Sequence, residues 1–353
     1  MKLKALLLGS AAAMIAITGA RAADAVIAEP EPVEYVRVCD MYGAGFFYIP
    51  GTETCLRISG YVDSQYEYTS VDGANNNSTG ESVFLARVNF DAREETDYGL
   101  LRSYIRIEGG NDNSTQAAMT IRQATIQLGG FETGYNTEKY GSDFGHKGLM
   151  LDGLYSAGTR VGFADYTFAA NGFSATAGFQ LDPRGNGVAT GTTLINGTTV
   201  VTPAGAPNLG PEKSFDPYLN ASYSGSIFYV AGALAYDTSD ESLAYRARLD
   251  VKPLDGFEVG VWYYGSENAG NTFTTNEHEI GVYATYAINE AISVAAAYDH
   301  AETHAGVETE AVTVGLDWKP VNNLIVRMNY RHTDNPTGTA DTDEFRVRIR
   351  RSF

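Results

Sequence analysis

The sequence lacks the short motifs that mark many enzymes. It has no GxGxxG or P-loop pattern for cradling phosphates and no GxSxG nucleophile elbow. Basic residues are also in short supply, with 25 Lys and Arg against 43 Asp and Glu and a formal net charge of -18. A strongly acidic chain repels phosphate backbones, so nucleic acid is not expected as a partner. We expect neither an enzyme nor a cofactor.

Residues 1–22 resemble a secretion signal, which would place the mature chain outside the cytoplasm. Lys2 and Lys4 precede an apolar run that is too short to span a bilayer, and Ala20-Arg21-Ala22 has the form of a cleavage site. Removing this segment would take away three basic and no acidic residues. The mature chain would therefore be more acidic still.

Cysteine is scarce, and the two that are present lie close together. Secretion carries Cys39 and Cys55 into an oxidising compartment, so we predict a disulfide between them, which would hold the N-terminal segment 23–54 near residue 55. Two free buried thiols are the alternative. Two ligands are too few for a structural zinc site.

Beyond residue 22 no hydrophobic run approaches the roughly 20 residues of a membrane helix. Instead, stretches of about ten residues alternate apolar and polar side chains, which predicts strands. In the last stretch Phe345 and Val347 alternate with Arg346 and Arg348. The expected strands cover 55–68, 82–93, 100–108, 119–129, 131–136, 160–169, 173–180, 216–224, 226–237, 242–252, 257–265, 278–287, 292–300, 308–318, 324–332 and 344–353.

Other features favour a membrane barrel over a soluble sandwich. Short turns alternate with longer polar loops, and the polar faces of the strands carry Arg with almost no Lys. Aromatic residues recur near strand ends, as girdles at two membrane interfaces would require: Tyr66, Tyr68, Tyr236, Tyr286, Tyr298, Trp318 and Tyr330. We therefore predict an all-β fold, a closed 16-stranded antiparallel transmembrane β-barrel over residues 55–353 with water inside.

The segment 33–57, VEYVRVCDMYGAGFFYIPGTETCLR, resembles the N-terminal signature of the general porins of alphaproteobacterial outer membranes, of the Rhizobiales and Brucella type. The agreement extends along the chain, through the strands to the terminal Phe353. The resemblance implies a homotrimer in the outer membrane, in contact with lipid and lipopolysaccharide. It implies passive diffusion of small hydrophilic solutes and ions. It also implies that the barrel insertion machinery recognises the last strand, which ends at Phe353.

The resemblance also implies that the third loop, residues about 137–159, folds into the lumen and narrows it. Its candidate constriction acids are Glu138, Asp143 and Asp152. The apolar cluster around Leu149 and Met150 would lie against the barrel wall, a patch in the trimer interface being the alternative. Opposite the loop we expect lumen-facing arginines: Arg57, Arg87, Arg102, Arg106, Arg346, Arg348 and Arg350. Each of these arginines could instead form a structural ion pair.

Two further readings stay open. A substrate-specific channel would use lumen aromatics, such as Tyr61, Tyr104, Trp262 and Tyr264. The acidic stretches 237–241 and 341–344 would lie in outer loops, where they face solvent or bind divalent cations that bridge lipopolysaccharide. No metal site is expected among the five histidines, because only His300 and His304 are close in sequence and HAETH is not the HExxH of zinc proteases.

Overall fold

A computed structural model of the chain describes residues 37–72, 78–111, 119–137, 139–141, 145–150, 160–181, 192–195, 198–201, 215–271, 273–274, 276–336 and 339–353. The chain divides into two units, 1–37 and 38–353. The expected secretion signal lies outside the described residues. The second unit contains all of the strands given below.

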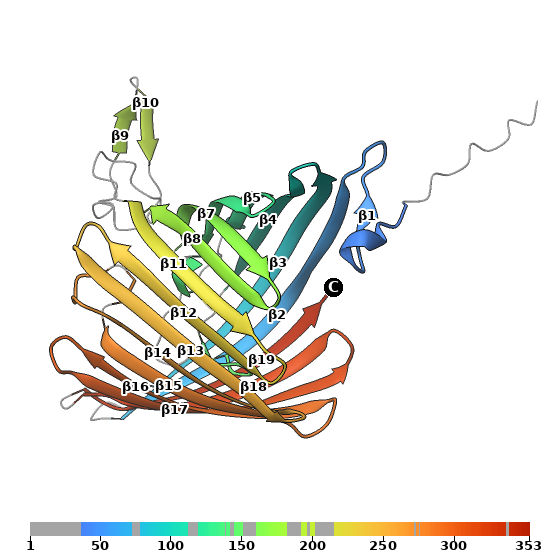
Figure 1. The fold of residues 1–353 in the computed structure, drawn as a ribbon. Helices are drawn as coiled ribbons and strands as arrows, with labels where there is room; N and C mark the ends of the chain where they lie inside the picture. Colours follow the sequence, from blue (N-terminus) through green and yellow to red (C-terminus); the bar gives the residue numbers. More distant parts are fainter. Residues whose placement is uncertain are drawn as a thin grey trace, which may run out of the picture. The chain divides into compact units, whose positions relative to one another are not determined.

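Sixteen antiparallel strands of the described chain form a closed ring, as expected. Each strand pairs with its neighbour along the chain, and the ring is completed by β8 with β11 and by β19 with β2. Figure 1 shows β19, in red, running beside β2, in blue. The strands are β2 Cys55–Val71, β3 Thr79–Thr96, β4 Gly99–Asn111, β5 Thr120–Leu128, β6 Phe131–Thr137, β7 Arg160–Ala170, β8 Phe173–Leu181, β11 Phe215–Ser224, β12 Phe228–Asp237, β13 Ser242–Leu254, β14 Phe257–Ser266, β15 Asn276–Ala287, β16 Ile292–Thr303, β17 Glu308–Val321, β18 Leu324–Asp334 and β19 Thr342–Ser352.

Three short strands and two helical turns add to the ring. β1 (Phe47–Tyr48) pairs with the start of β2, and β9 (Thr192–Ile195) pairs with β10 (Thr198–Val201) between β8 and β11. The 3-10 turns are η1 (Asp40–Tyr42) and η2 (Lys139–Gly141). Among the described residues, no helix is long and apolar enough to cross a membrane.

The ring reverses the burial pattern of a soluble protein. Apolar side chains on its outer face are exposed, with Val62 at 56%, Phe84 at 47% and Val314 at 45%. Inner-face neighbours are polar and buried, and Asp63 and Asp91 are 4% and 1% exposed. The expected girdle residues are all at least 39% exposed: Tyr66, Tyr68, Tyr236, Tyr286, Tyr298, Trp318 and Tyr330. An apolar exterior around a polar interior is the arrangement of a barrel that crosses a bilayer.

The connections alternate in length because consecutive strands run in opposite directions. At one end of the ring the links are short, as at 171–172, 255–256 and 322–323. Gly172, Gly256 and Asn323 have φ of 82°, 74° and 62°, in the left-handed region that tight hairpin turns require. Short turns mark the periplasmic end of such barrels, and β2 begins and β19 ends there.

The segment before β2 is fixed to this periplasmic end. The expected disulfide joins Cys39 to Cys55, with their Cα atoms 6.0 Å apart. Phe46 packs beside the disulfide and is 1% exposed. The guanidinium groups of Arg57 and Arg93 lie 4.7 and 4.9 Å from the centre of the Phe46 ring. Because both arginines project from the inner face of β2 and β3, the segment lies against the inside of the barrel mouth.

Candidate pore and constriction

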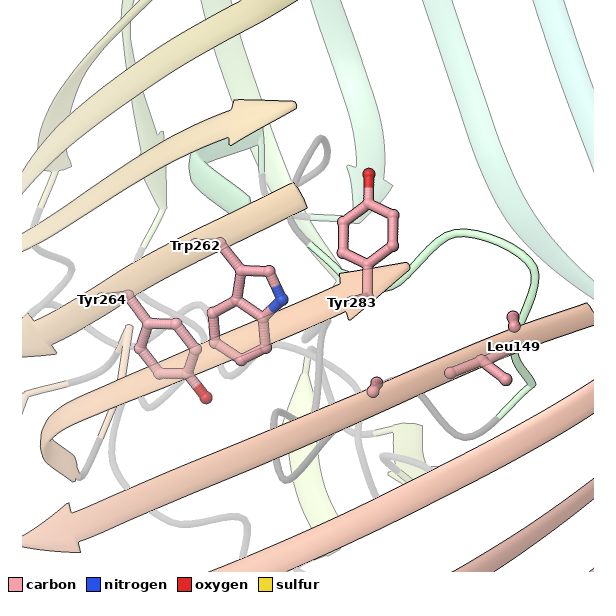
Figure 2. Packing of buried hydrophobic residues seen from close by; sticks show 6 residues of the cluster. Leu149, Trp262, Tyr264 and Tyr283 are labelled. Carbon is pink, nitrogen blue, oxygen red and sulfur yellow. The ribbon is translucent and has the colours of Figure 1, made fainter. Parts of the chain in front are cut away.

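The third loop enters the lumen and packs against one part of the wall. Leu149, 4% exposed, forms a cluster with Trp262 and Tyr264 of β14 and with Tyr283 of β15. Figure 2 shows the Leu149 side chain on the loop segment beside these strands. The wall leaves room for it, because a Cβ at Gly315 of β17 would lie only 2.6 Å from Leu149 Cδ2. The expectation that this apolar segment lies against the wall is confirmed for Leu149.

Hydrogen bonds hold the backbone of the loop to the same wall. The Met150 N–H donates to Asn329 Oδ1 at 2.6 Å, and Arg327 Nη1 donates to the Leu149 carbonyl at 3.4 Å. A loop backbone buried in a wall must find such partners, since an unmade hydrogen bond there costs about 1–3 kcal/mol. Strand β18 supplies them from two alternate inner positions.

Two basic residues of the loop lie beside buried carboxylates of the wall. His146 Nε2 lies 3.0 Å from Asp299 Oδ1, and both side chains are fully buried. Lys147 Nζ lies 2.9 Å from Asp250 Oδ2 and also contacts Glu258. Burial acts against the Lys147 ammonium, but hydrogen bonds to these two carboxylates outweigh burial and raise its pKa above 10.5. Lys147 therefore stays charged at any physiological pH.

The beginning of the loop packs on the neighbouring strands. Tyr140 is fully buried in a cluster with Tyr218 and Phe273, and the Arg246 guanidinium lies 4.2 Å from the centre of its ring. Lys139 Nζ lies 2.6 Å from Glu132 Oε2 of β6. Lys139 thus contacts β6 and β7, and the other described loop residues up to 150 contact inner-face residues from β11 to β18. The candidate constriction acids Glu138, Asp143 and Asp152 lie outside the described residues.

The expected arginines lie on the other part of the ring, on β19, β2, β3 and β4. Arg350 makes two bonds of 2.6 Å to the Asp63 carboxylate, and Arg348 Nε lies 3.7 Å from the same group. Arg346 Nη2 lies 2.9 Å from Glu67 Oε2. These pairs join β19 to β2 across the point where the barrel closes, so the guanidinium groups are held in fixed positions.

A second group of arginines surrounds one carboxylate nearer the periplasmic end. Asp91, 1% exposed, accepts from Arg102 Nε at 2.7 Å and from Arg93 Nη2 at 2.8 Å. Arg57 Nη2 lies 3.4 Å from the same carboxylate. Three cations share one anion here, so this stretch of wall keeps an excess of positive charge.

A third group surrounds Glu108 of β4. Arg87 and Arg122 form ion pairs with it, whereas Arg106 and Arg160 have no carboxylate within ion-pair distance among the described residues. The Nε atoms of Arg106, Arg122 and Arg160 are buried and have no hydrogen-bond partner within the described part of the chain. Sequence reasoning proposed Arg87 and Arg106 but missed the other two. Alternation alone would not have placed them, because Arg122 falls at a register shift between β4 and β5, and Arg160 shares its set of alternate positions with the exposed Tyr166 and Phe168 of β7.

Of the four lumen aromatics considered for a substrate-specific channel, two are not available to solutes. Trp262 and Tyr264 are each 1% exposed and stack on one another with ring centres 5.2 Å apart, in the cluster that holds Leu149. Tyr61 remains at the wall, between Arg350 and Arg87, whose guanidinium carbons lie 3.8 and 4.6 Å from its ring centre. The aromatic pair on β14 therefore supports the loop.

A closed sixteen-stranded ring with an apolar exterior, a charged lining and an inward-folded loop defines a transmembrane channel of the porin class. The family model described as "Porin subfamily" matches residues 24–348. The chain belongs to this family, and it is an outer-membrane porin. Membership indicates a channel rather than an enzyme.

Relatives and solved structures agree with this placement. Porin Omp2b of Brucella neotomae and Porin Omp2b of Brucella abortus are each 37% identical over 306 residues, which cover 80% of this chain and 78% of each relative. The outer membrane channel DcaP of Acinetobacter baumannii has a similar fold, with a TM-score of 0.64, 12% identity and coverage of 87% and 99% of the two chains. OmpT of Vibrio cholerae gives a TM-score of 0.59 at 14% identity, covering 86% of this chain and 99% of its own.

Proposed function

We propose that the barrel is a passive diffusion pore for small hydrophilic molecules and ions, narrowed between the third loop and the arginine wall of β19 and β2 to β4. One observation carries the proposal. The described part of the loop is held to strands β6, β7 and β11 to β18, and the arginines of β19 and β2 to β4 lie on strands that it leaves uncovered. Solutes would therefore pass between the loop and the arginines.

The arginines would set the electrostatics of this passage. Those on β19 and β2 are held by ion pairs with carboxylates of adjacent strands, so their charges stay in place as ions pass. Opposed fixed charges across a narrow aqueous section produce a transverse field that orients water and dipolar solutes. We keep Glu138, Asp143 and Asp152 as the proposed acidic side of this field, and Arg57, Arg87, Arg102, Arg106, Arg346, Arg348 and Arg350 as the basic side. Arg122 and Arg160 join the basic side.

The remaining elements of the proposal follow from the family. We propose a homotrimer with one pore in each barrel, lipid and lipopolysaccharide around it, and Phe353 as the signal for barrel insertion. In its support, the Phe353 N–H and carbonyl both bond to Gly60 at 3.0 Å, so the terminal residue extends the pairing of β19 with β2. Residues 1–22 are proposed as a cleaved secretion signal.

The test is the reversal potential of the refolded protein in a planar bilayer under a salt gradient. Replacing Arg346 and Arg348 by Ala removes two positive charges from the lumen and should shift selectivity toward cations. Arg351→Ala is the matched control, because Arg351 lies on the same strand, at an exposed position of the outer face. An unchanged reversal potential in the double variant would remove β19 from the selectivity filter.

The second candidate function, a substrate-specific channel, rests on the Tyr61 site between two arginines. It predicts that the conductance saturates with one solute and is blocked by it. Ohmic conductance that rises in proportion to salt, with no solute that blocks, supports general diffusion. Absence of conductance from a folded barrel would overturn both.

A further inference from the structure

Three of the five histidines lie on the outer face of the barrel, near the ends of the strands away from the periplasmic turns. His278 and His300 alternate with the inner-face residues Glu279 and Asp299, which are fully buried. Ile280 and Tyr298 share the outer face with them and are 38% and 41% exposed. His332 of β18 holds the corresponding position beside Tyr330, which is 43% exposed.

Strand pairing brings two of these histidines to one carboxylate, although 22 positions separate them in the sequence. His278 of β15 stands opposite Glu302 of β16, and His300 precedes Glu302 by two residues on the same face. One ligand atom from each of the three groups lies within 4.8 Å of the others. His278 Nε2 is 3.5 Å from Glu302 Oε2, and the two imidazole rings are 6.2 Å apart.

The neighbouring residues restrict the orientation of both imidazoles. The Tyr263 ring of β14 stacks on His278 at 6.4 Å and an interplanar angle of 22°. Glu310 of β17 places Oε1 3.5 Å from His300 Nδ1. A carboxylate beside one nitrogen of a ligating imidazole is the usual outer support of a metal site, because it fixes the ring and raises its basicity.

We propose that His278, His300 and Glu302 bind a divalent transition metal ion of the zinc and copper class at the outer rim of the barrel. Two imidazoles with one carboxylate suit Zn²⁺, Cu²⁺ and Ni²⁺, whereas Ca²⁺ and Mg²⁺ prefer sites made of oxygen atoms alone. The ligands stand on two adjacent strands of a closed sheet, so little ordering entropy opposes binding. The side chains are between 23% and 32% exposed, which leaves the site open to ions from the outside.

A second group nearby is a natural comparison. His332, Asp334 and Asp341 also bring one ligand atom each to within 4.8 Å of the others. It holds a single imidazole, whose Nδ1 faces Asp343 at 2.8 Å and whose Nε2 faces Asp334 at 3.1 Å. With one nitrogen ligand instead of two, this group should bind the same metals more weakly.

The experiment uses the folded, tag-free protein in detergent and two probes. Zn²⁺ titrated by calorimetry gives the affinity, and Cu²⁺ examined by electron paramagnetic resonance counts the coordinating nitrogens. The wild type should bind one tight equivalent and show hyperfine coupling to two imidazole nitrogens. His278→Ala and His300→Ala should each weaken Zn²⁺ binding about tenfold or more and leave one nitrogen in the Cu²⁺ spectrum.

Two control variants separate this site from its surroundings. His304→Ala removes a histidine just beyond β16 whose Nε2 faces the Ser266 hydroxyl at 3.2 Å, and it should bind like the wild type. His332→Ala should also keep the tight equivalent. Unchanged Zn²⁺ affinity in His278→Ala and His300→Ala, or a wild-type Cu²⁺ spectrum with a single nitrogen, would overturn the proposal. The outcome does not depend on conductance, so the proposed pore function stands or fails separately.

Discussion

Truncating Leu149 should loosen the third loop from the wall and change how the channel gates. The side chain is 4% exposed and packs on Trp262, Tyr264 and Tyr283. Burial of a leucine at this level makes Leu→Ala cost about 2–5 kcal/mol. We take about 2 kcal/mol, because the lumen is wet and the space left behind can fill with water.

This loss of stabilising free energy shifts the equilibrium between the docked and the undocked loop. At 1.4 kcal/mol for each tenfold change, about 2 kcal/mol lowers the ratio of docked to undocked loop about 30-fold. The bonds from Asn329 and Arg327 to the loop backbone remain, so the docked form should still dominate. An undocked loop occupies the passage, and brief closures should therefore become about 30-fold more frequent.

Single-channel recording at constant voltage measures these closures directly. Leu149→Met keeps the volume and should behave like the wild type, since such exchanges cost less than about 1.5 kcal/mol. Leu234→Ala removes the same atoms from an outer-face position that is 47% exposed, and it tests for a general loss of barrel stability. If Leu149→Ala forms folded barrels with wild-type closure rates, the aromatic cluster does not hold the loop.

Two further predictions concern the third loop and the N-terminal segment, both of which are held to the barrel. Because the pKa of Lys147 is raised above 10.5, its contribution to loop docking is complete below that pH and is lost as pH rises through the raised value. Closures should thus stay constant up to about pH 10.5 and increase above it, while Lys147→Met should close often at neutral pH with no alkaline rise. Reducing the bond between Cys39 and Cys55, which are 16 positions apart, removes a constraint of about 3 kcal/mol on that segment. Protease should then cleave residues 38–54 while the barrel keeps its heat-dependent gel mobility; continued protection would show that the Phe46 contacts suffice alone.

The barrel could be predicted from the sequence because apolar and polar side chains alternate along every one of its strands. All sixteen expected strands are present, and the observed ends differ by at most three residues, as in β3, expected at 82–93 and observed at Thr79–Thr96. Each side chain must face either lipid or water, so the pattern persists along every strand. β1, β9 and β10 were not predicted, because strands of two or four residues are too short to show a period.

The candidate site could be predicted only in part, because its contacts join distant strands. The Leu149 segment was expected to lie on a wall, but the sequence could not name Trp262 or Asn329 as its partners. No role in holding the loop was expected for His146 or Lys147 from the sequence, yet both lie beside buried carboxylates of the wall. The proximity of His278 to His300 could not be read from the sequence for a related reason. Only His300 and His304 are close in sequence, whereas the register of β15 on β16 brings His278 opposite Glu302.

The uneven lining of the lumen follows from the cost of removing charges from water. Where the loop docks, water is displaced, and an unpaired arginine beneath it would lose its hydration without compensation. The wall there presents aromatic residues and carboxylates that lie beside basic loop residues, and its buried Arg248 bonds to Asp250 and to the Tyr283 hydroxyl. Arginines that share a carboxylate, such as those around Asp91 and Glu108, are tolerated only where the lumen stays wet. Docking the loop on one part of the ring therefore favours an excess of positive charge on the other part, along the proposed path of the solutes.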